Sequence, residues 1–246
     1  MLVKSQVKYI QSLGHKKFRD ADGVFVAEGP KIVAEFLQSE KLSLVQGFAT
    51  SQWLSAHVDI LDGRKKLISP VTDKELERIS FHPSPHQVLA IFKKPVFKSQ
   101  HEMTGIQLLL DTIQDPGNMG TILRTADWFG VSRIVCSNDT VDAFNPKVVQ
   151  SAMGSLVRVE VIYTNLTEYI QAKKDIPVYA SSLDGEDIHE NIPRSNAILL
   201  LGNESKGIGP ELESLATKKI RIPGKGGAES LNVAVAAGIL LSRFNV

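Results

Sequence analysis

The chain has 246 residues, of which 43% are hydrophobic and 22% are charged, and its formal net charge is only +1. This is the composition of an ordinary globular protein, long enough for one large domain or two modest ones. The single cysteine, Cys136, excludes a disulfide framework and a cysteine-based zinc site, and its apolar neighbours in "RIVCSN" predict a buried structural thiol. No apolar run is long enough to cross a bilayer, and residues 1–17 lack the apolar core of a signal peptide, so we expect a soluble cytoplasmic protein.

Positive charge is concentrated in the first part of the chain. Residues 1–100 carry 15 Lys and Arg against 10 Asp and Glu, whereas residues 101–246 carry 13 against 17. The first 19 residues contain no acidic side chain and five basic ones, Lys4, Lys8, Lys16, Lys17 and Arg19. A basic stretch of this kind indicates a polyanionic partner such as RNA. A solvated helix face would give the same pattern, so charge alone leaves both interpretations open.

Short helical and strand-like segments alternate in residues 1–96. Pro30 suits the first turn of a helix, where a backbone N–H donor is not needed. The expected helices are residues 7–14, 30–39 and 73–79, and the expected strands are residues 23–29, 43–50, 65–70 and 87–92. This alternation predicts a small α/β domain.

A second α/β domain is expected in residues 105–246. It follows a polar, proline-containing stretch between two apolar runs, which we interpret as a linker at residues 97–104. The expected strands are residues 106–111, 132–137, 157–163, 177–182, 196–202 and 218–223, and the expected helices are residues 119–130, 145–154, 166–174, 210–216 and 230–244. These strands are continuous apolar runs rather than alternating ones, which is typical of a parallel sheet covered on both faces.

The common nucleotide-binding motifs do not fit this sequence. Gly202 and Gly207 have the spacing of a phosphate-binding loop, but isoleucine and glycine follow Gly207 where lysine and a hydroxyl residue are needed. No G-x-G-x-x-G follows an early strand, which argues against dinucleotide binding. His82 and His86 are four residues apart, but the prolines of "HPSPH" argue against a helical metal pair, and we predict no metal site.

Three polar, glycine-rich loops follow strand ends, which is where ligands bind in open α/β sheets. "DPGNMGTILRTADWFGV" (residues 115–131), "LLGNESKGIGPEL" (residues 200–212) and "IRIPGKGGAESLNVAVAAGILL" (residues 220–241) resemble motifs 1, 2 and 3 of the SpoU (TrmH-like) RNA ribose methyltransferases, in the SPOUT superfamily. Their order, spacing and positions after strands all fit. In the first domain "FVAEGPKIVAEFL" resembles the substrate-binding domain of that family, which has a ribosomal-protein-L30-like fold.

This resemblance covers nearly the whole chain and implies a fold, a cofactor and an activity. The fold would be a parallel SPOUT sheet whose C-terminal part forms a trefoil knot, a feature so rare that composition could not have suggested it. The cofactor would be S-adenosylmethionine (SAM), bound in the knot, and the protein would be a homodimer. The activity would be methyl transfer to a ribose 2′-hydroxyl of ribosomal or transfer RNA, with residues 1–96 binding the RNA.

The family match also assigns residues to the cofactor. It places Gly202, Ile222 and Leu231 around the adenosyl group of SAM, with Ala180 and Ser181 as further candidates. Glycine lets a ligand approach the backbone, and apolar side chains suit the adenine ring. Ile222 and Leu231 could instead belong to the ordinary core.

Motif 1 supplies two candidate catalytic residues, Asn118 and Arg124. The family match assigns to Arg124 the removal of the hydroxyl proton, but a guanidinium stays charged and has no acceptor. We therefore favour a role in which Arg124 grips an RNA phosphate and stabilises negative charge on the attacking oxygen. Asn118 could position Arg124 or the ribose, or it could only cap its helix.

Motifs 2 and 3 supply Glu204, Ser230 and Asn232 as the other catalytic candidates. The Glu204 carboxylate can hold a donor or cationic group at the end of its strand, and nearby Lys206 could contact phosphate. Ser230 also suits a helix N-cap. Asn232 is harder to explain by structure alone, because a buried amide needs hydrogen-bond partners.

The sequence departs from the family pattern at two positions. Gly224 follows Pro223 where the family usually has methionine, so the "GKGG" loop is expected to be more flexible. Gln87 stands before "VLAIF" where the family often has glycine, which could alter the RNA-binding surface of the first domain.

Two other functions compete with methyl transfer. A catalytically silent RNA-binding protein could keep the same fold, but the presence of all five candidate catalytic residues argues against it. A small-molecule nucleotide enzyme is disfavoured by the basic N-terminal region and the missing phosphate motifs. The sequence does not distinguish ribosomal from transfer RNA, since RNA is recognised largely by shape and by unstacked bases.

Overall fold

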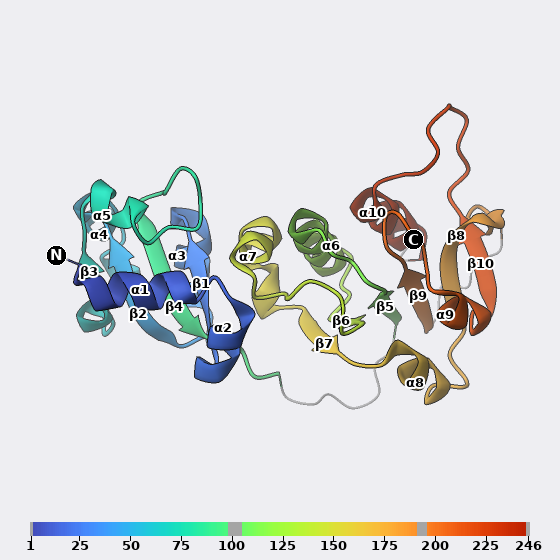
Figure 1. Cartoon of the computed structure of the whole chain (residues 1–246), viewed down its shortest axis with the longest axis horizontal. Coiled ribbons are helices and arrows are strands. Elements are labelled where there is room, and N and C mark those ends of the chain that lie inside the picture. The colour runs from blue at the N-terminus through green and yellow to red at the C-terminus, as the bar shows by residue number, and fades with distance from the viewer. Residues whose placement is uncertain (1, 98–104, 191–195, 245–246) are drawn as a thin grey trace. The chain divides into compact units, whose positions relative to one another are not determined.

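The computed structural model describes residues 2–97, 105–190 and 196–244 and divides the chain into two compact units (Figure 1). The first unit comprises Met1–Phe97 together with Asp142–Val157. The second comprises Lys98–Val141 and Arg158–Val246. Apart from its first residue, the expected linker at residues 97–104 lies outside the described residues.

A mixed four-stranded sheet forms the centre of the first unit, in the order β1-β4-β2-β3. β4 is antiparallel to β1 and to β2, whereas β2 and β3 are parallel. The strands are β1 (Val24–Glu28), β2 (Leu44–Ala49), β3 (Ile68–Pro70) and β4 (Val88–Lys93). The α-helices of residues 2–97 are α1 (Lys4–Ser12), α2 (Lys16–Asp22), α3 (Pro30–Gln38), α4 (Ser51–Ala56) and α5 (Asp73–Glu77). Two short 3₁₀ helices, η1 (Asp59–Leu61) and η2 (Lys65–Leu67), precede β3.

The two faces of this sheet bury different side chains, because successive residues of a strand point to opposite faces. On one face, Val24 and Val26 of β1 join a cluster with Ile10 of α1 and Leu76 of α5. On the other face, the Phe25 ring lies 5.7 Å from that of Phe36 on α3 and 5.9 Å from that of Phe92 on β4. Helix α1 is therefore part of the core and not a detachable basic arm.

A six-stranded parallel sheet forms the second unit, in the order β10-β8-β9-β5-β6-β7 (Figure 1). Its strands are β5 (Ile106–Leu110), β6 (Arg133–Cys136), β7 (Glu160–Tyr163), β8 (Val178–Asp187), β9 (Ala197–Leu201) and β10 (Lys218–Arg221). The helices of this unit are α6 (Pro116–Trp128), α8 (Leu166–Gln171), α9 (Pro210–Ser214) and α10 (Val233–Phe244). Between β6 and β7 the chain also forms α7 (Pro146–Ala152) and a 3₁₀ helix, η3 (Met153–Val157), which belong to the first unit.

Helices cover both faces of the parallel sheet, as its fully buried strands β5 and β9 require. On one face, Leu109 and Leu200 pack with Leu166 and Ile170 of α8 and Leu212 of α9. In Figure 1, α6 and α10 lie side by side on the opposite face. Burial of each such large apolar side chain stabilises the folded state by about 1.5–3 kcal/mol.

The predicted α/β class and the six parallel strands of the second unit are confirmed. Helices α2 and α4 were not predicted from the sequence, and β8 continues five residues beyond the expected strand end, to Asp187. The last helix begins at Val233 rather than at Ser230. Cys136 is buried on β6 as predicted, and desolvation raises the pKa of its thiol, which keeps it protonated. The trefoil knot stays a prediction.

Two further findings concern the described residues, 2–97, 105–190 and 196–244. No helix there is long and apolar enough to cross a membrane. No group of three or more His, Cys, Asp or Glu side chains in this part of the chain could hold a metal ion.

Gln87, where the family often has glycine, adopts a left-handed backbone conformation with φ of 57°. Its carbonyl accepts a hydrogen bond from the Thr50 N–H at 2.8 Å, which holds the loop before β4 against the end of β2. A left-handed conformation is unfavourable for residues with a Cβ atom but not for glycine. The glycine preference at this position thus has a local backbone reason.

We predict that Gln87→Gly raises the free energy of unfolding by about 0.5–1 kcal/mol, because relief of backbone strain exceeds the added entropy of the unfolded chain. Urea denaturation of the two proteins measures the difference. The matched control is Gln46→Gly on β2, where the backbone is extended and glycine should destabilise the protein by a similar amount. Equal destabilisation by both variants would contradict the prediction.

Candidate active site

The loops that carry motifs 1, 2 and 3 leave the same edge of the parallel sheet. Motif 1 follows β5, motif 2 follows β9 and motif 3 follows β10, and these parallel strands end on the same side. In the order β10-β8-β9-β5, β9 is the neighbour of β5 and is separated from β10 by β8 alone. The topology therefore brings together polar residues that are 86 and 114 positions apart in the sequence.

Asn118, Glu204 and Asn232 form one continuous hydrogen-bonded network. The Asn118 Nδ2 donates to Glu204 Oε1 at 2.6 Å, and Asn232 Nδ2 donates to Asn118 Oδ1 at 2.9 Å. The two ends of the Asn118 amide thus have different partners, which fixes its orientation. Each of the three motifs contributes one member, so the network depends on all three loops being in place.

The loop that carries Glu204 is held in shape by its own backbone and by Asn203. The backbones of Asn203 and Gly207 exchange two hydrogen bonds of 2.9 Å. The Asn203 side chain accepts from the N–H groups of Ser205 and Lys206, and its Nδ2 donates to the Thr112 carbonyl at 2.8 Å. Asn203 therefore ties the motif 2 loop to the residue that follows Asp111, just before motif 1.

Gly202 lies where the start of this loop comes close to the backbone of Gly207 and Ile208. A Cβ atom at this position would overlap the backbone of Gly207 and Ile208. The glycine that the family match assigns to the cofactor site thus has a steric role as well, because only glycine permits this close approach.

Sequence reasoning did not identify Asp111 and Thr112 as supporting residues. Asp111, which is 9% exposed, accepts from the Gly209 N–H at 2.8 Å and from the Thr112 hydroxyl at 2.9 Å. Thr112 has a positive φ of 58°. An acidic residue directly after a buried strand was the available signal, since buried polar groups need partners.

The structure corrects two capping assignments. Asp115, not Asn118, caps α6, because its carboxylate accepts from the Asn118 N–H at 2.8 Å. The interpretation of Asn118 as only a cap was therefore wrong. Asn232, not Ser230, caps α10, since its Oδ1 accepts from the N–H groups of Ala234 and Val235. Asn232 thus has a structural role as well as its bond to Asn118.

Arg124 and Ser230 do not join the network among the described residues. Arg124 lies on α6 and is exposed, and no ion pair or hydrogen bond of its guanidinium is found within the described part of the chain. Ser230 is exposed in the irregular segment between β10 and α10. An exposed guanidinium of this kind is able to bind an incoming phosphate group.

Comparisons with known proteins agree on one family. Residues 105–242 match the SpoU rRNA Methylase family, and residues 4–90 match an MRM3-like substrate binding domain. The chain belongs to the SpoU family. The resemblance inferred from the three motifs is confirmed, and so are the enzyme class and the cofactor that it implied, a SAM-dependent RNA 2′-O-methyltransferase.

Similar proteins cover nearly the full length of the chain. The 23S rRNA (guanosine(2553)-2′-O)-methyltransferase RlmP of Bacillus subtilis is 33% identical over 239 residues, which are 96% of this chain and 94% of that protein. The solved structure of a putative RNA methyltransferase of the TrmH family from Porphyromonas gingivalis matches 100% of this chain and 98% of its own, with a TM-score of 0.86 and 37% identity. An AdoMet-bound rRNA methyltransferase from Sinorhizobium meliloti covers 99% and 95%, with a TM-score of 0.84 and 31% identity.

Most of the residues that the sequence resemblance assigns to SAM lie in or directly after three neighbouring strands, β8, β9 and β10. Ala180 of β8 is buried and pairs with Leu200 of β9, and Ser181 follows it. Gly202 follows β9, and Ile222 follows β10 and is half-buried. Leu231, next to Asn232 in the sequence, is 48% exposed. Backbone groups at strand ends and an exposed apolar side chain fit an adenosyl group.

We predict that Asn232→Ala lowers the free energy of unfolding by about 1 kcal/mol, because it removes the N-cap of α10. Ser230→Ala is the matched control and should leave stability unchanged, since Ser230 caps no helix. Thermal and urea denaturation of both variants provide the measurement. A loss of stability in Ser230→Ala with none in Asn232→Ala would contradict this assignment of the cap.

Proposed function

We propose that the chain methylates a ribose 2′-hydroxyl of ribosomal RNA and that the Glu204–Asn118–Asn232 network is the centre of its catalytic site. The network carries the proposal, because it joins one residue from each motif with hydrogen bonds of 2.6 and 2.9 Å. Ribosomal RNA is favoured over transfer RNA by the B. subtilis relative, whose name states a 23S rRNA substrate. Transfer RNA is the alternative substrate class.

We assign Arg124 to the phosphate beside the reacting ribose. Bound SAM supplies the methyl group as an electrophile, so the protein must orient the ribose hydroxyl and stabilise negative charge on its oxygen. The exposed guanidinium of Arg124 can contact a phosphate through two parallel N–H donors. It has no acceptor and so does not take the hydroxyl proton.

Glu204, Asn118 and Asn232 would hold the ribose. The amide of Asn118 is fixed between the other two side chains, and the exposed Glu204 carboxylate retains acceptor capacity for a hydroxyl group of the substrate. Ser230 would add a hydroxyl near Leu231 and the adenosyl group. Ala180, Ser181, Gly202 and Ile222 would line the rest of the cofactor site.

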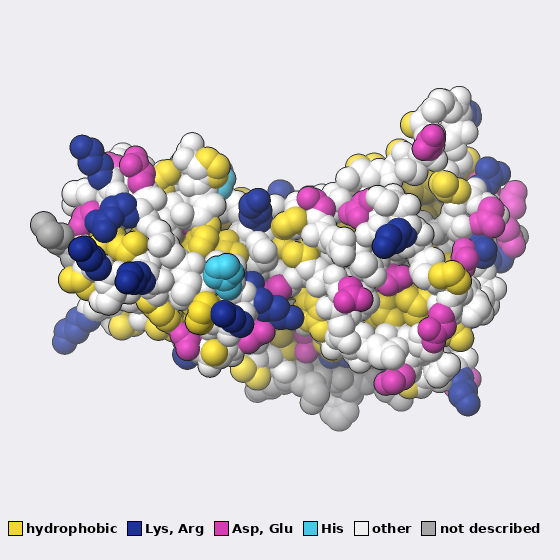
Figure 2. All heavy atoms as spheres, in the orientation of Figure 1, with side chains coloured by type: hydrophobic (Ala, Val, Ile, Leu, Met, Phe, Trp, Pro, Cys, Tyr) yellow, Lys and Arg dark blue, Asp and Glu magenta, His cyan; other side chains and the backbone are white. Residues whose placement is uncertain are grey.

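The two regions of the chain that match different family models would have different functions. Residues 1–96 would bind RNA and residues 105–246 would bind SAM and transfer the methyl group. In support, Lys4 and Lys8 of α1 and Lys16 and Lys17 of α2 are exposed, and Figure 2 shows basic side chains gathered over these helices. Arg19 does not belong to this surface, because it is 1% exposed. Of the five basic residues in the first 19, only the four lysines are therefore available to RNA.

We also propose a homodimer and a cytoplasmic location. Val235 of α10 is 51% exposed and Trp128 of α6 is 85% exposed, although α6 and α10 pack against each other. A second copy of the chain that covers these apolar groups would remove them from water. A cytoplasmic enzyme would have direct access to ribosomal RNA.

The decisive variants are Arg124→Ala and Arg124→Lys. Both should lose about 10²–10³ in turnover, because an ammonium group lacks the planar fork that binds phosphate at two points. Both should fold normally and bind SAM with unchanged affinity. The measurement is methyl incorporation into ribosomal RNA and, separately, into transfer RNA, beside calorimetric titration with SAM.

Several results would count against the assignment. Near-normal methylation by Arg124→Lys would show that charge alone is sufficient, and near-normal methylation by Arg124→Ala would remove Arg124 from the site. Incorporation into transfer RNA alone would contradict the proposed substrate. A wild-type chain that binds SAM and RNA but methylates neither RNA would favour the catalytically silent alternative.

RNA affinity should depend on the exposed lysines of α1 and α2. The triple variant Lys4→Gln/Lys8→Gln/Lys17→Gln should weaken RNA binding and reduce the slope of log affinity against log salt by about 2, because about 0.7 counterions are released per phosphate contact on single strands. SAM affinity should not change. The control is Lys66→Gln on the same unit, and an equal loss there would show that only total charge matters. Deletion of residues 1–19 is unsuitable, because α1 is part of the core.

A further inference from the structure

One segment of the methyltransferase sequence packs within the RNA-binding unit. Residues 142–157, here called the inserted segment, fall inside the 105–242 match to the SpoU family but belong to the first unit. Helix α7 packs on β1, and η3 packs on α3. The Phe144 ring lies 5.1 Å from that of Phe25, and Lys94 Nζ lies 4.9 Å from the centre of the Phe144 ring.

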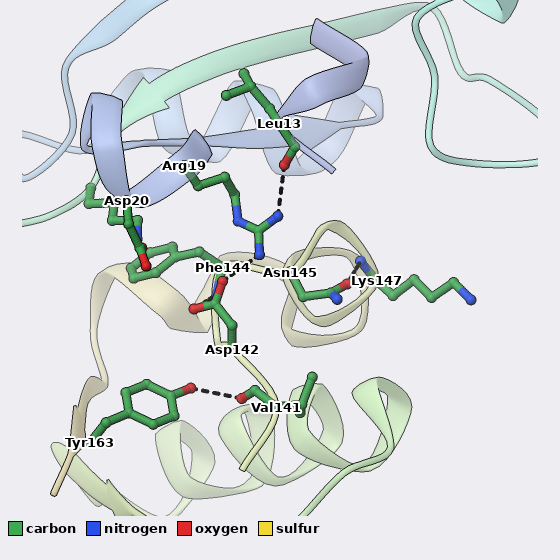
Figure 3. A network of polar contacts seen from close by, with 10 residues as sticks. Leu13, Arg19, Asp20, Val141, Asp142, Phe144, Asn145, Lys147 and Tyr163 are labelled. Carbon is green, nitrogen blue, oxygen red and sulfur yellow. Dashed lines mark hydrogen bonds and ion pairs between the residues drawn. The ribbon is translucent and has the colours of Figure 1, made fainter. Parts of the chain in front are cut away.

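A buried ion pair fixes the start of the inserted segment to α2. Arg19 Nη2 contacts Asp142 Oδ2 at 2.5 Å, and the two side chains are only 1% and 9% exposed (Figure 3). Arg19 Nη1 also donates to the Leu13 carbonyl at 2.7 Å, which orients the guanidinium. Desolvation offsets much of the attraction in a buried pair, so such a pair is weak evidence for stability, and its best-attested use is to specify register.

The residues directly before Asp142 hold the loop that leads into motif 1. The Val141 N–H donates to the Ile113 carbonyl at 2.8 Å, and the Ile113 N–H donates to Thr140 Oγ1 at 3.3 Å. The Tyr163 hydroxyl donates to the Val141 carbonyl at 2.8 Å (Figure 3). Ile113 is two residues from Asp115, the cap of the helix that carries Asn118.

We propose that Arg19 and Asp142 are positioning residues for methyl transfer. Helix α2 presents Lys16 and Lys17 at the RNA-binding surface and, through Arg19, holds Asp142 in the core. Asp142 is joined through one peptide bond to Val141, which holds Ile113. The ion pair thereby restrains Asp142, and through the peptide bond it restrains Val141 and the hydrogen bond that holds Ile113. This proposal assumes the RNA methyltransferase site described above.

An ion pair at this position has a directional geometry, which an apolar contact lacks. Apolar side chains of similar size would fill the same volume but would allow the inserted segment to shift along its contact with α2. A guanidinium between a carboxylate and the Leu13 carbonyl permits one arrangement only. The ion pair therefore specifies where the inserted segment lies on α2, which the stability of the fold alone would not require.

The test compares removal of the charge with replacement of the whole pair. Asp142→Asn should lower kcat at saturating RNA about 10-fold, which is within the range seen when a coupling residue is lost. Its affinities for SAM and RNA should stay unchanged. Asp142→Asn should also lower the thermal midpoint of unfolding. The double variant Arg19→Met/Asp142→Leu should have the wild-type thermal midpoint, because a packed apolar pair is often as stable as a buried ion pair. It should keep the lowered kcat.

The matched control is Asp20→Asn, which removes a charge from α2 but leaves the Arg19–Asp142 pair in place. Asp20 pairs with Lys94 at the surface, and this variant should have the wild-type kcat. Recovery of both the thermal midpoint and kcat in the double variant would overturn the proposal, because the pair would then be only structural. A loss of kcat in Asp20→Asn equal to that of Asp142→Asn would overturn it as well.

Hydrogen–deuterium exchange separates this proposal from the proposed function. In Asp142→Asn and in the double variant, amides of residues 111–120 should exchange about 10-fold faster than in the wild type, without RNA present. They should be unchanged in Asp20→Asn. Unchanged exchange at residues 111–120 with faster exchange at residues 142–157 would overturn the link. If the wild type methylates no RNA, the proposed function fails, and the exchange result alone decides the link.

Discussion

The amide of Asn118 is the contact on which the candidate site depends. An amide offers donors at one end and an acceptor at the other, and here Glu204 occupies the donor end while Asn232 occupies the acceptor end. A carboxylate only accepts, so it suits the position of Glu204 but not that of Asn232, where a donor is needed. Three loops that are distant in the sequence are thereby joined through one side chain.

That contact is possible because the strands are parallel, with β9 beside β5 and only β8 between β9 and β10. Each of β5, β9 and β10 ends at the same edge of the sheet, so its following loop starts beside the others. A second set of bonds then fixes the loops. Asp111 holds Gly209, and Asn203 holds the Thr112 carbonyl. These supporting residues do not need to touch RNA or SAM, yet the position of Glu204 depends on them.

The basic N-terminal region has two separate roles. Lys4, Lys8, Lys16 and Lys17 are exposed and suited to phosphate, whereas Arg19, in the same run of charge, is buried against Asp142. Charge patterning treats these five side chains alike, because it contains no information on burial. Arginine suits the buried position better than lysine, since its planar guanidinium contacts the Leu13 carbonyl and Asp142 together.

The sequence by itself determined the α/β class, the six parallel strands and the three motif loops, because apolar runs and strand-end glycines are local signals. It also identified the family, since the three motifs together are specific. Only the tertiary structure decided that Asn232 rather than Ser230 caps α10 and that residues 142–157 pack with the first unit. It likewise decided that Arg19 is buried. The reason is that a polar side chain takes the partner that packing places beside it, and the choice between neighbouring caps or between water and a distant carboxylate is not encoded in local spacing.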